Sequence, residues 1–491
     1  MKQVQKKTLD PAVGQMLLTA RRRRLPLAWD RAEGQQPRCG FGRLALCCSD
    51  CQEGVCRINP FGGEEQRTIC GRGKEELIGR RLTAKTADGA LALLKLAAAG
   101  YGIGGEWMQE LLPTADEMLA EESYAARLFR LGRCTGELLG ALQAAKHAGG
   151  SWQPQISQVN LGVLRADQVN IVFCGHVPAA VVAGLRTAAG SLAIPVVFGA
   201  VCGNEWSDGL GIPALTNYDS QETPLLTGAV DLLVVGRQCV MPAVIRLAEQ
   251  LDIAKVDAAS LDSTDAFTSA AAAAQASFRR RDKATLAIPA ESGPVYAGFS
   301  AGSIAGLLTS LDAPAAGPLR GVVYLGGCGS VANTQDARPA AIAAALVMAG
   351  YLVVTAGCAG VSLAKAGMCR TEWRDGQHGL QRLAAAGLPP VLTVGSCQDA
   401  GEFLQLARQL PGLTTAAFFP EINHNKVLAA AVAFAAAGID TWVDWEAAAA
   451  DDAVASCLER EFVSRSGAGL RPLPEQADWP ELLAALRPAE G

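Results

Sequence analysis

The chain has 491 residues, of which 50% are apolar and 19% are charged, and its formal net charge is −5. This length allows two or three domains with a large buried core. A weakly acidic chain is not attracted to nucleic acid or to an anionic lipid surface, which excludes both as main partners. The fifteen cysteines are more informative, because metal ligation explains them better than disulfides do in a chain of this size.

The first residues, MKQVQKKTLD, contain no apolar run behind their basic side chains. We therefore expect no secretory signal and a cytoplasmic location. The basic run Arg21–Arg24 that follows fits a solvated helix end, with a docking or cofactor-access role as the alternative.

A cysteine-rich motif follows, with the spacing C-x7-C-C-x2-C-x4-C-x13-C and several glycines that permit tight turns. Cysteines two to four residues apart in a turn-rich stretch can converge on one iron–sulfur cluster, for which thiolate is the required soft ligand. Structural zinc is the alternative, but six cysteines exceed one zinc site. The six are Cys39, Cys47, Cys48, Cys51, Cys56 and Cys70.

The adjacent cysteines in this motif are predicted to serve different clusters. Cys39 and Cys47 supply only half of a ligand set, so a twofold axis would have to provide the other half. We therefore expect a homodimer bridged by one shared cluster. A complete ligand set for an internal 4Fe–4S cluster is available from Cys48, Cys51, Cys56 and Cys70.

The rest of the chain predicts helices followed by α/β units. Residues 74–150 show helical periodicity, and from about residue 155 short β-branched runs alternate with Ala-rich helical stretches. We expect a helical cluster-binding domain over 1–154 and two Rossmann-like α/β domains with parallel sheets over 155–312 and 313–491. The uncharged stretch from Ala340 to Ala364 is interpreted as a buried helix and strand separated by Gly350, and not as a membrane span.

Six predicted strands run into a thiol or an imidazole side chain. Open parallel sheets place ligands at the carboxyl ends of their strands, and three of these ends fall in each α/β domain. We therefore expect the two domains to face each other across a metal cluster. A single buried cysteine is often only a small apolar residue, but six at the same position make coincidence a poor explanation. The six are His176, Cys202, Cys239, Cys328, Cys358 and Cys397.

The remaining thiols are interpreted without a metal. Cys134, Cys369 and Cys457 fall in helical stretches and are expected in the core or on the surface. Cys174 is ambiguous, because it lies two residues before His176.

Two groups of motifs resemble those of anaerobic nickel–iron carbon monoxide dehydrogenases. The first comprises LAWDRAEGQQPRCGFG, LCC-x2-C-x4-C-RINPFG and TICG. The second comprises GHVP, GNE, VVGRQCVMP, GGC, GC-x6-KAG and GSC-x-D, in the order that carries the family's active-site cluster.

The resemblance covers most of the chain. It implies that the six strand-end residues hold a nickel–iron–sulfur cluster. It also implies an electron-transfer 4Fe–4S cluster and a cluster on the dimer axis. FFPEINHNKVLAAA resembles the segment with the family's catalytic lysine, which implies Lys426.

Three departures from the family pattern matter. Cys202 directly precedes GNE without the usual spacer, so Glu205 is an alternative oxygen ligand. LAAAGYGIGGEW lacks the catalytic histidine expected in the helical region, and the chain has only four histidines. Proton delivery is then expected from Lys426, His424 or water. The chain is also shorter than is usual for the family, and many of the missing residues are expected in the helical region before His176.

Three functions remain open from the sequence. The first is oxidation of CO with water to CO2, with two electrons passing to a ferredoxin-like carrier, as the resemblance implies. The second is a hybrid-cluster reductase of hydroxylamine or a related small molecule, with an iron–sulfur–oxo cluster and Glu205 or Glu421 as a ligand. The third is a non-catalytic electron-transfer protein with an empty interdomain site. A nucleotide-binding site is not supported, because no G-x-G-x-x-G is followed by an acidic residue at the required distance.

Overall fold

The computed structural model describes residues 6–63, 66–107, 123–148, 150, 152–310, 319–373, 380, 383, 387–446, 451–474, 482–483 and 486. His378, one of the four histidines, lies outside these residues. The helices are α1 Pro11–Arg23, α2 Ala28–Gly34, α3 Gly40–Arg43, α4 Lys74–Tyr101, α6 Tyr124–Ala148, α7 Ala179–Ala189, α8 Thr223–Leu226, α9 Pro242–Gln250, α10 Thr264–Arg280, α11 Ala301–Ser310, α12 Ala337–Met348, α13 Gly357–Lys365, α15 Gly401–Gln409, α16 Asn425–Ala436 and α18 Asp452–Ser466.

Thirteen strands in the described part of the chain form one sheet, in the order β15-β14-β13-β10-β11-β12-β9-β3-β6-β5-β4-β7-β8. They are β3 Gln155–Val159, β4 Val169–Cys174, β5 Val196–Val201, β6 Ala214–Thr216, β7 Leu232–Val235, β8 Ala254–Asp257, β9 Gly293–Ala297, β10 Gly321–Leu325, β11 Tyr351–Thr355, β12 Val391–Thr393, β13 Thr414–Phe419, β14 Asp440–Val443 and β15 Leu470–Pro472.

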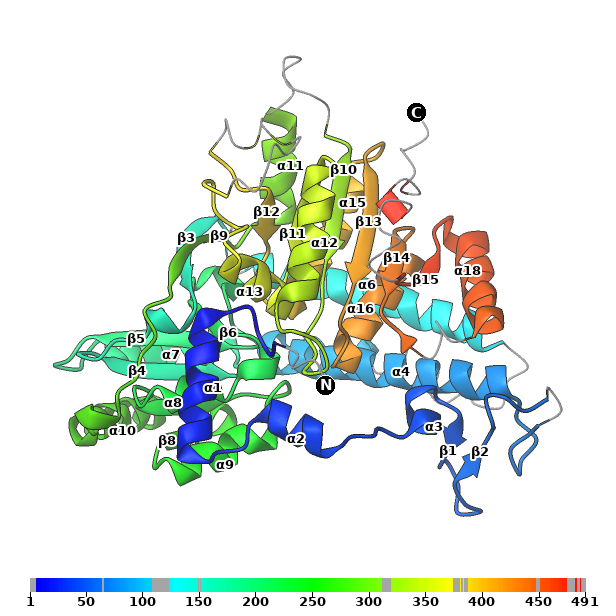
Figure 1. Ribbon diagram of the computed structural model, residues 1–491. Coiled ribbons are helices and arrows are strands. Elements are labelled where there is room, and N and C mark those ends of the chain that lie inside the picture. Colours follow the sequence, from blue (N-terminus) through cyan, green and yellow to red (C-terminus); the bar gives the residue numbers. More distant parts are fainter. Residues whose placement is uncertain are drawn as a thin grey trace.

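The sheet consists of two parallel halves that meet at one antiparallel pair, β3 with β9. On one side β3 continues in parallel to β6, β5, β4, β7 and β8, and on the other β9 continues in parallel to β12 and beyond. In Figure 1 the strands of the first half run across the view, whereas those of the second half run up it. The predicted α/β class with largely parallel strands is therefore confirmed.

The second half of the sheet begins before the predicted boundary at residue 313. Strand β9 pairs with β12, and helix α11 packs against α15, so both belong with the second half. The sheet is continuous through the β3–β9 pair, because residues 155–159 and 293–297 exchange ladder hydrogen bonds. The domain boundaries themselves stay a prediction.

The uncharged stretch within residues 340–364 forms buried elements of this sheet. Helix α12 ends at Met348, Gly350 adopts φ +89°, and β11 begins at Tyr351. A positive φ is readily adopted only by glycine, which explains the stop at this position. Among the described residues, no helix is long and apolar enough to cross a membrane.

Helix α1 attaches the N-terminal segment to the first half of the sheet. Its buried face, including Val13 and Met16, packs in one core with residues of the β4–β7 region. Asp10 caps the helix by accepting a hydrogen bond from the backbone N–H of Ala12 at 2.9 Å. The basic run Arg21–Arg24 is exposed at the other end, as expected for a solvated helix end.

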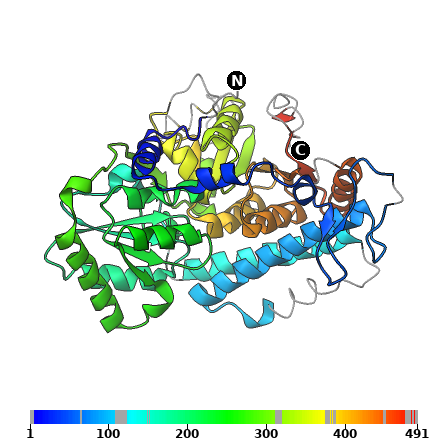
Figure 2. The same cartoon turned by 60° about the horizontal axis from the view of Figure 1, so that its bottom comes forward.

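Helix α16 packs against both long helices, α4 and α6, and Figure 2 shows these three running side by side. Close approach is possible because two glycines face it. A methyl group at Gly89 of α4 would overlap the carbonyl oxygen of Asn425, and one at Gly132 of α6 would lie 2.7 Å from that of Val432. Since glycine costs about 1 kcal/mol in a helix interior relative to alanine, these positions indicate a packing requirement.

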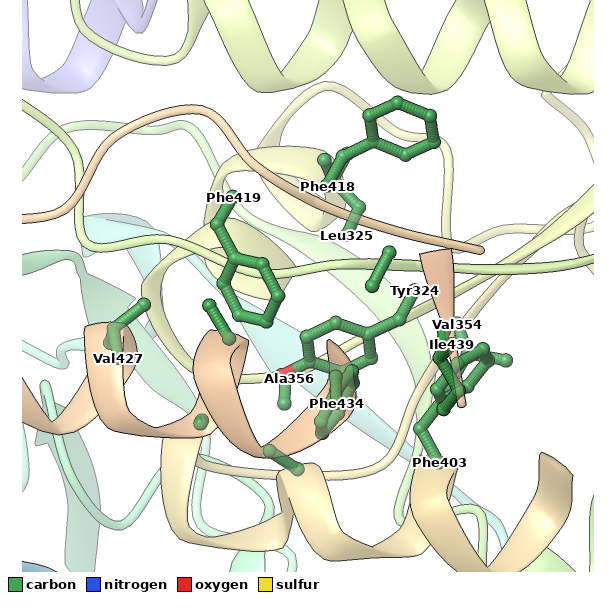
Figure 3. Packing of buried hydrophobic residues seen from close by; sticks show 14 of the residues in the cluster. Tyr324, Leu325, Val354, Ala356, Phe403, Phe418, Phe419, Val427, Phe434 and Ile439 are labelled. Carbon is green, nitrogen blue, oxygen red and sulfur yellow. The ribbon is translucent and has the colours of Figure 1, made fainter. Parts of the chain in front are cut away.

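An aromatic cluster fixes the other side of α16 against the second half of the sheet. Tyr324 of β10 lies between Phe419 of β13 and Phe434 of α16, with ring centroids 5.5 and 4.9 Å away, and Phe403 of α15 completes the cluster (Figure 3). All four rings are buried. Helix α16 is therefore held between the long helices and the sheet, with its first turn at the carboxyl ends of the strands.

Candidate metal centre

The strand-end residues predicted from the sequence lie within a few residues of the ends of their strands, five in turns and Cys358 in the first turn of α13. His176 follows β4, and its backbone N–H and C=O bond to Arg237 in the turn after β7. Cys202 and Cys239 have φ values of +55° and +51°. For residues other than glycine, this left-handed conformation costs about 1–3 kcal/mol each and is typical of functional sites. The structure thus holds two of the thiols in strained turns.

These turns bring side chains of both sheet halves together. The Cys202 and Cys358 sulfur atoms are 3.3 Å apart, and the Cys397 sulfur lies 3.5 Å from His176 Nε2. Cys328 is held by its backbone N–H, which bonds to the carbonyl oxygen of Glu421 at 2.8 Å. Cys239 interacts with the thiol of Cys202 and the imidazole of His176. All six predicted residues therefore surround one buried site, while their role as ligands stays a prediction.

Lys426 enters the same site from the first turn of α16. Its Nζ lies 2.7 Å from His176 Nε2 and 3.2 Å from the Cys239 sulfur, and the residue is only 3% exposed. A lysine is rarely buried this deeply without a partner of opposite charge. The site therefore demands anionic groups around this ammonium, which thiolates provide.

The electrostatics of the site are set by burial and by this lysine. Burial would lower the pKa of Lys426, but attraction to the thiolates of Cys239 and Cys397 raises it. A hydrogen bond from Cys202 and the charge of Lys426 outweigh burial and lower the pKa of Cys239. Burial, followed by repulsion from Lys426, lowers the pKa of His176 to about 4. The site thus favours a neutral imidazole beside a thiolate, which are the ligand forms that metals need.

Glu205 is buried beside the site but is engaged with the backbone. Its Oε2 accepts a 2.5 Å hydrogen bond from the N–H of Gly203, and burial raises its pKa to about 7. The neighbouring Asn204 bonds both the N–H and the carbonyl of Val177, which ties the two turns together. The geometry therefore favours the sulfur of Cys202 over the carboxylate of Glu205 as the ligand.

The donor set fits a cluster better than a single ion. Within the described residues, no three His, Cys, Asp or Glu side chains converge closely enough to hold one metal ion. The ligands of a cluster lie farther apart, because each sulfur binds a different metal atom. Thiolates are the soft donors that iron–sulfur clusters and nickel accept, and five of them face this site with one imidazole. The residues present thus fit a nickel–iron–sulfur cluster.

His424 lies next to the site at the start of α16. Its ring packs edge-on against Tyr218 with centroids 4.7 Å apart, and it interacts with Cys239. Its buried Nε2 has no hydrogen-bond partner among the described residues. The structure therefore places both predicted proton-delivery residues, Lys426 and His424, beside the same thiol.

One contact with a strand-end residue was not predicted. Gln398 Nε2 lies 2.6 Å from His176 Nδ1 and so fixes the orientation of the ring. It occupies the variable position of GSC-x-D, which gave no signal in the sequence. The carbonyl of Gln398 in turn accepts a 2.8 Å hydrogen bond from Gln143 of α6.

The N-terminal motif forms a separate, more exposed structure. The short strands β1 Cys47–Cys48 and β2 Cys56–Arg57 pair so that Cys48 lies opposite Cys56. The Cys70 sulfur lies 3.3 Å from Thr68 Oγ1, and Cys47 accepts a long contact of 3.8 Å from Arg81. Cys39, Cys51 and Cys70 are exposed. The turns place the six cysteines on one exposed segment.

The four remaining thiols are buried or half-buried. Burial raises the pKa of Cys174 to about 12, and its sulfur contacts Gln221 at 3.7 Å. Cys134 and Cys457 are half-buried on α6 and α18. Cys369 is buried in a turn that follows α13, and not in a helix as expected, because α13 ends at Lys365 ahead of Gly367, whose φ is +79°.

Comparisons with known proteins point to one family. The model of the Prismane/CO dehydrogenase family matches residues 105–468. The chain is 29% identical to carbon monoxide dehydrogenase 2 of Carboxydothermus hydrogenoformans and to the carbon monoxide dehydrogenase of Rhodospirillum rubrum, in each case over 86% of this chain and 88% of the relative. The solved structure of carbon monoxide dehydrogenase IV from C. hydrogenoformans matches with a TM-score of 0.86 and 25% identity, over 97% of this chain and 98% of that one.

Proposed function

Because the chain belongs to the Prismane/CO dehydrogenase family, we propose that it oxidises carbon monoxide at a nickel–iron–sulfur cluster between the two halves of its sheet. The balanced reaction is CO + H2O → CO2 + 2 H⁺ + 2 e⁻. One observation carries the proposal: Lys426 is buried against His176 and Cys239 among thiols from both halves. An ammonium group at this position can stabilise the negative charge that develops on the oxygen atoms as CO is converted to CO2.

Each residue has a defined part in this proposal. When bound, the cluster would supply a Lewis acid and a sink for two electrons. Lys426 would stabilise negative charge that develops on the substrate oxygens. His424 and water would accept the two protons, because Lys426 is already protonated. The residues that would hold the cluster are His176, Cys202, Cys239, Cys328, Cys358 and Cys397.

The hybrid-cluster alternative is less well supported. The relatives that match most of the chain carry the name carbon monoxide dehydrogenase. Both candidate carboxylate ligands have other partners, Glu205 on the backbone of Gly203 and Glu421 on the side chain of Asn333 at 2.7 Å. A cluster with an oxygen ligand would have to displace one of these hydrogen bonds.

We also propose that the protein is a homodimer with a cluster shared through Cys39 and Cys47. The cysteine-rich segment exposes three large apolar side chains, Val55 at 59%, Phe61 at 95% and Ile69 at 70%. Apolar groups gathered on one exposed segment are typical of an interaction surface, and a twofold interface would bury them twice. The internal 4Fe–4S cluster would relay electrons to a ferredoxin-like carrier. The exposed thiols require a reducing compartment, which supports a cytoplasmic location.

The test is an assay of one oxygen-free preparation whose nickel and iron are quantified. We expect CO-dependent reduction of an artificial electron acceptor in proportion to nickel, and little hydroxylamine reduction. Hydroxylamine reduction without CO oxidation in nickel-loaded protein would favour the hybrid-cluster function instead. Absence of a cluster between the two halves would exclude both enzymes and leave the electron-transfer role.

A further inference from the structure

A buried lysine outside the metal site connects the two halves of the sheet. Lys146 lies in the last turn of α6, and its side chain is 0% exposed. Its Nζ lies 2.6 Å from Asp399 Oδ1 and 3.3 Å from Asp208 Oδ1. Asp208 belongs to the first half of the sheet, in the turn η2 Ser207–Gly209 that follows Cys202 and GNE. Asp399 belongs to the second half, in the turn η6 Cys397–Ala400.

Asp399 organises the turn that presents Cys397. Its Oδ2 accepts hydrogen bonds from the backbone N–H of Ser396 at 2.8 Å and from Ser207 Oγ at 2.7 Å. The second of these bonds crosses from one half of the sheet to the other. Gln398, in the same turn, holds the His176 ring at 2.6 Å. The position of this turn therefore decides where two of the proposed ligands, Cys397 and His176, point.

Lys146, Asp208 and Asp399 form a charged network, and its Asp208 side faces the end of α4. The phenol of Tyr101 donates a hydrogen bond to Asp208, and the Lys146 ammonium lies 5.5 Å from the Tyr101 ring centroid. Tyr101, Asp208, His176 and Gln398 line one narrow pocket. This is the end of the helical region in which the family's histidine is absent, so a Tyr–Asp–Lys–Asp network lies beside His176 here.

We propose that Lys146 is a positioning residue for the interdomain cluster, because it is the cation that joins the ligand-bearing turns of the two sheet halves. Without it, the buried carboxylate of Asp399 and the partly buried carboxylate of Asp208 would repel each other and move the Cys397 turn away from the Cys202 turn. This inference rests on the proposed function, since it takes Cys397, Cys202 and His176 as ligands. Residues that orient metal ligands typically contribute about 10- to 100-fold to metal affinity or activity.

The test compares four variants of the full-length protein, purified without oxygen. Lys146→Met leaves both carboxylates unpaired, whereas Asp208→Asn breaks the bridge but leaves Lys146 with Asp399. The double variant leaves one unpaired carboxylate. Arg133→Met removes an exposed cation from the same helix and serves as the matched control. The readouts are the EPR spectrum of the interdomain cluster, nickel and iron per chain, and the melting temperature.

We expect Lys146→Met to shift the EPR signal of the interdomain cluster and to lower its nickel occupancy about 10-fold or more. The N-terminal clusters should keep their iron. Asp208→Asn should shift the same signal less, and the double variant should recover part of the loss. Arg133→Met should match the parent. If Lys146→Met does not fold, the proposal is tested by comparing the EPR signal of Asp208→Asn with that of Arg133→Met.

A purely structural role would lower the melting temperature of Lys146→Met and leave the spectrum of its remaining cluster unchanged, which would overturn the inference. An unshifted signal in Asp208→Asn would overturn it as well. The proposed function is judged separately, by CO oxidation in the parent protein. A parent with an intact cluster and no CO oxidation would contradict that function and leave the positioning role standing.

Discussion

At the scale of single residues, the buried ammonium of Lys426 decides what the site can do. It faces an imidazole and a thiol at 2.7 and 3.2 Å and is only 3% exposed. A fixed positive charge in a water-excluded site stabilises developing negative charge without reorganising. We predict that Lys426→Met lowers kcat for CO oxidation by about 10²–10³, because one such donor is typically worth that much.

This variant is informative only if the cluster persists. Nickel and iron content should be close to that of the parent, since Lys426 is not a proposed ligand. Lys255→Met, which removes a lysine on the surface strand β8 paired with Glu249, is the matched control and should keep full activity. Unchanged kcat in Lys426→Met at full nickel content would show that the lysine has no part in the reaction.

The absent histidine gives a second prediction at this scale. In the structure, Tyr101 at the end of α4 lines the same pocket as His176. Its phenol does not titrate near neutral pH, because burial raises its pKa. General acid–base assistance is worth about 10²–10⁴ in rate. We predict that CO oxidation per nickel is slower by about this factor than in the Rhodospirillum rubrum enzyme measured side by side. Equal rates would mean that the missing imidazole is dispensable.

The sequence identified the strand-end residues but not what supports them. Each of those side chains directly follows its own β-branched run, so local pattern and the geometry of parallel sheets were enough to group them. Lys426 was recognised only through the resemblance to a family. Lys146 gave no signal, because a lysine in the last turn of a helix is ordinary. Its two carboxylate partners are 62 and 253 positions away in the chain and meet it only in the folded protein.

At the scale of elements, two glycines set how closely the long helices approach α16. Gly89 of α4 faces the carbonyl oxygen of Asn425, one residue before Lys426. A side chain there meets backbone, which cannot move aside as a flexible side chain would. We predict that Gly89→Ala destabilises the fold by about 1–3 kcal/mol and lowers CO oxidation by displacing the first turn of α16.

The control for this prediction is Gly140→Ala. Gly140 lies on α6 with nothing within 4 Å of where a methyl group would be, so alanine should be neutral or slightly stabilising. The measurements are the melting temperature and the CO oxidation rate per nickel. Gly89→Ala with the stability and activity of the control would show that α16 is not held by this contact.

Another prediction concerns how α1 is attached. Asp10 caps this helix, lies 3.2 Å from buried Lys365 and accepts a 3.0 Å hydrogen bond from Asn160. Burial would raise the pKa of Asp10, but Lys365 and the hydrogen bonds lower it overall. A lowered pKa stabilises the fold above the unfolded value of about 3.9, and this stabilisation is lost as the pH falls through the folded pKa.

We therefore expect Asp10→Asn to cost about 1–3 kcal/mol at pH 7 and progressively less below about pH 4. The measurement is the difference in melting temperature from the parent at pH 7, 4 and 3. Asp282→Asn is the control, because Asp282 makes the same type of backbone cap on an exposed turn and forms no ion pair with any described residue. A difference that stays constant with pH would contradict the role of the ion pair.

The elements themselves were largely predictable. The helix and strand around Gly350 are confirmed because glycine ends a helix and β-branched residues begin a strand there. The helical periodicity of residues 74–150 is confirmed in α4 and α6, while residues 108–122 and 149 lie outside those described. What the sequence did not reveal is the spacing between helices, which depends on contacts such as Gly89 with Asn425.

At the scale of the whole molecule, the site forms where the two parallel halves of the sheet meet. The pattern of strands predicted two parallel sheets, but not that β3 and β9 would join them into one. That pairing links residues about 140 positions apart and carries no local signal. It turns the carboxyl ends of both halves toward each other, so that thiols such as Cys202 and Cys358 approach to 3.3 Å. The candidate metal site therefore depends on both halves of the sheet.

The last prediction concerns the assembly of two such chains. Cys39 and Cys47 can supply only two thiolates, whereas a cluster of the 4Fe–4S type needs four. Replacing both with serine should therefore remove one cluster per dimer, and it should weaken association because the shared cluster joins the subunits. The exposed apolar side chains of Val55, Phe61 and Ile69 would still favour contact, so dissociation should become concentration-dependent rather than complete.

Iron content and sedimentation velocity at several protein concentrations measure these two effects. Cys134→Ser, which removes a half-buried thiol of α6 outside the motif, is the matched control and should behave as the parent. The double variant should keep the internal cluster, whose proposed ligands are untouched, and it should keep the interdomain cluster as well. Full iron content in the double variant would refute the shared cluster, and loss of all N-terminal iron would mean that the two sets of ligands cannot be separated.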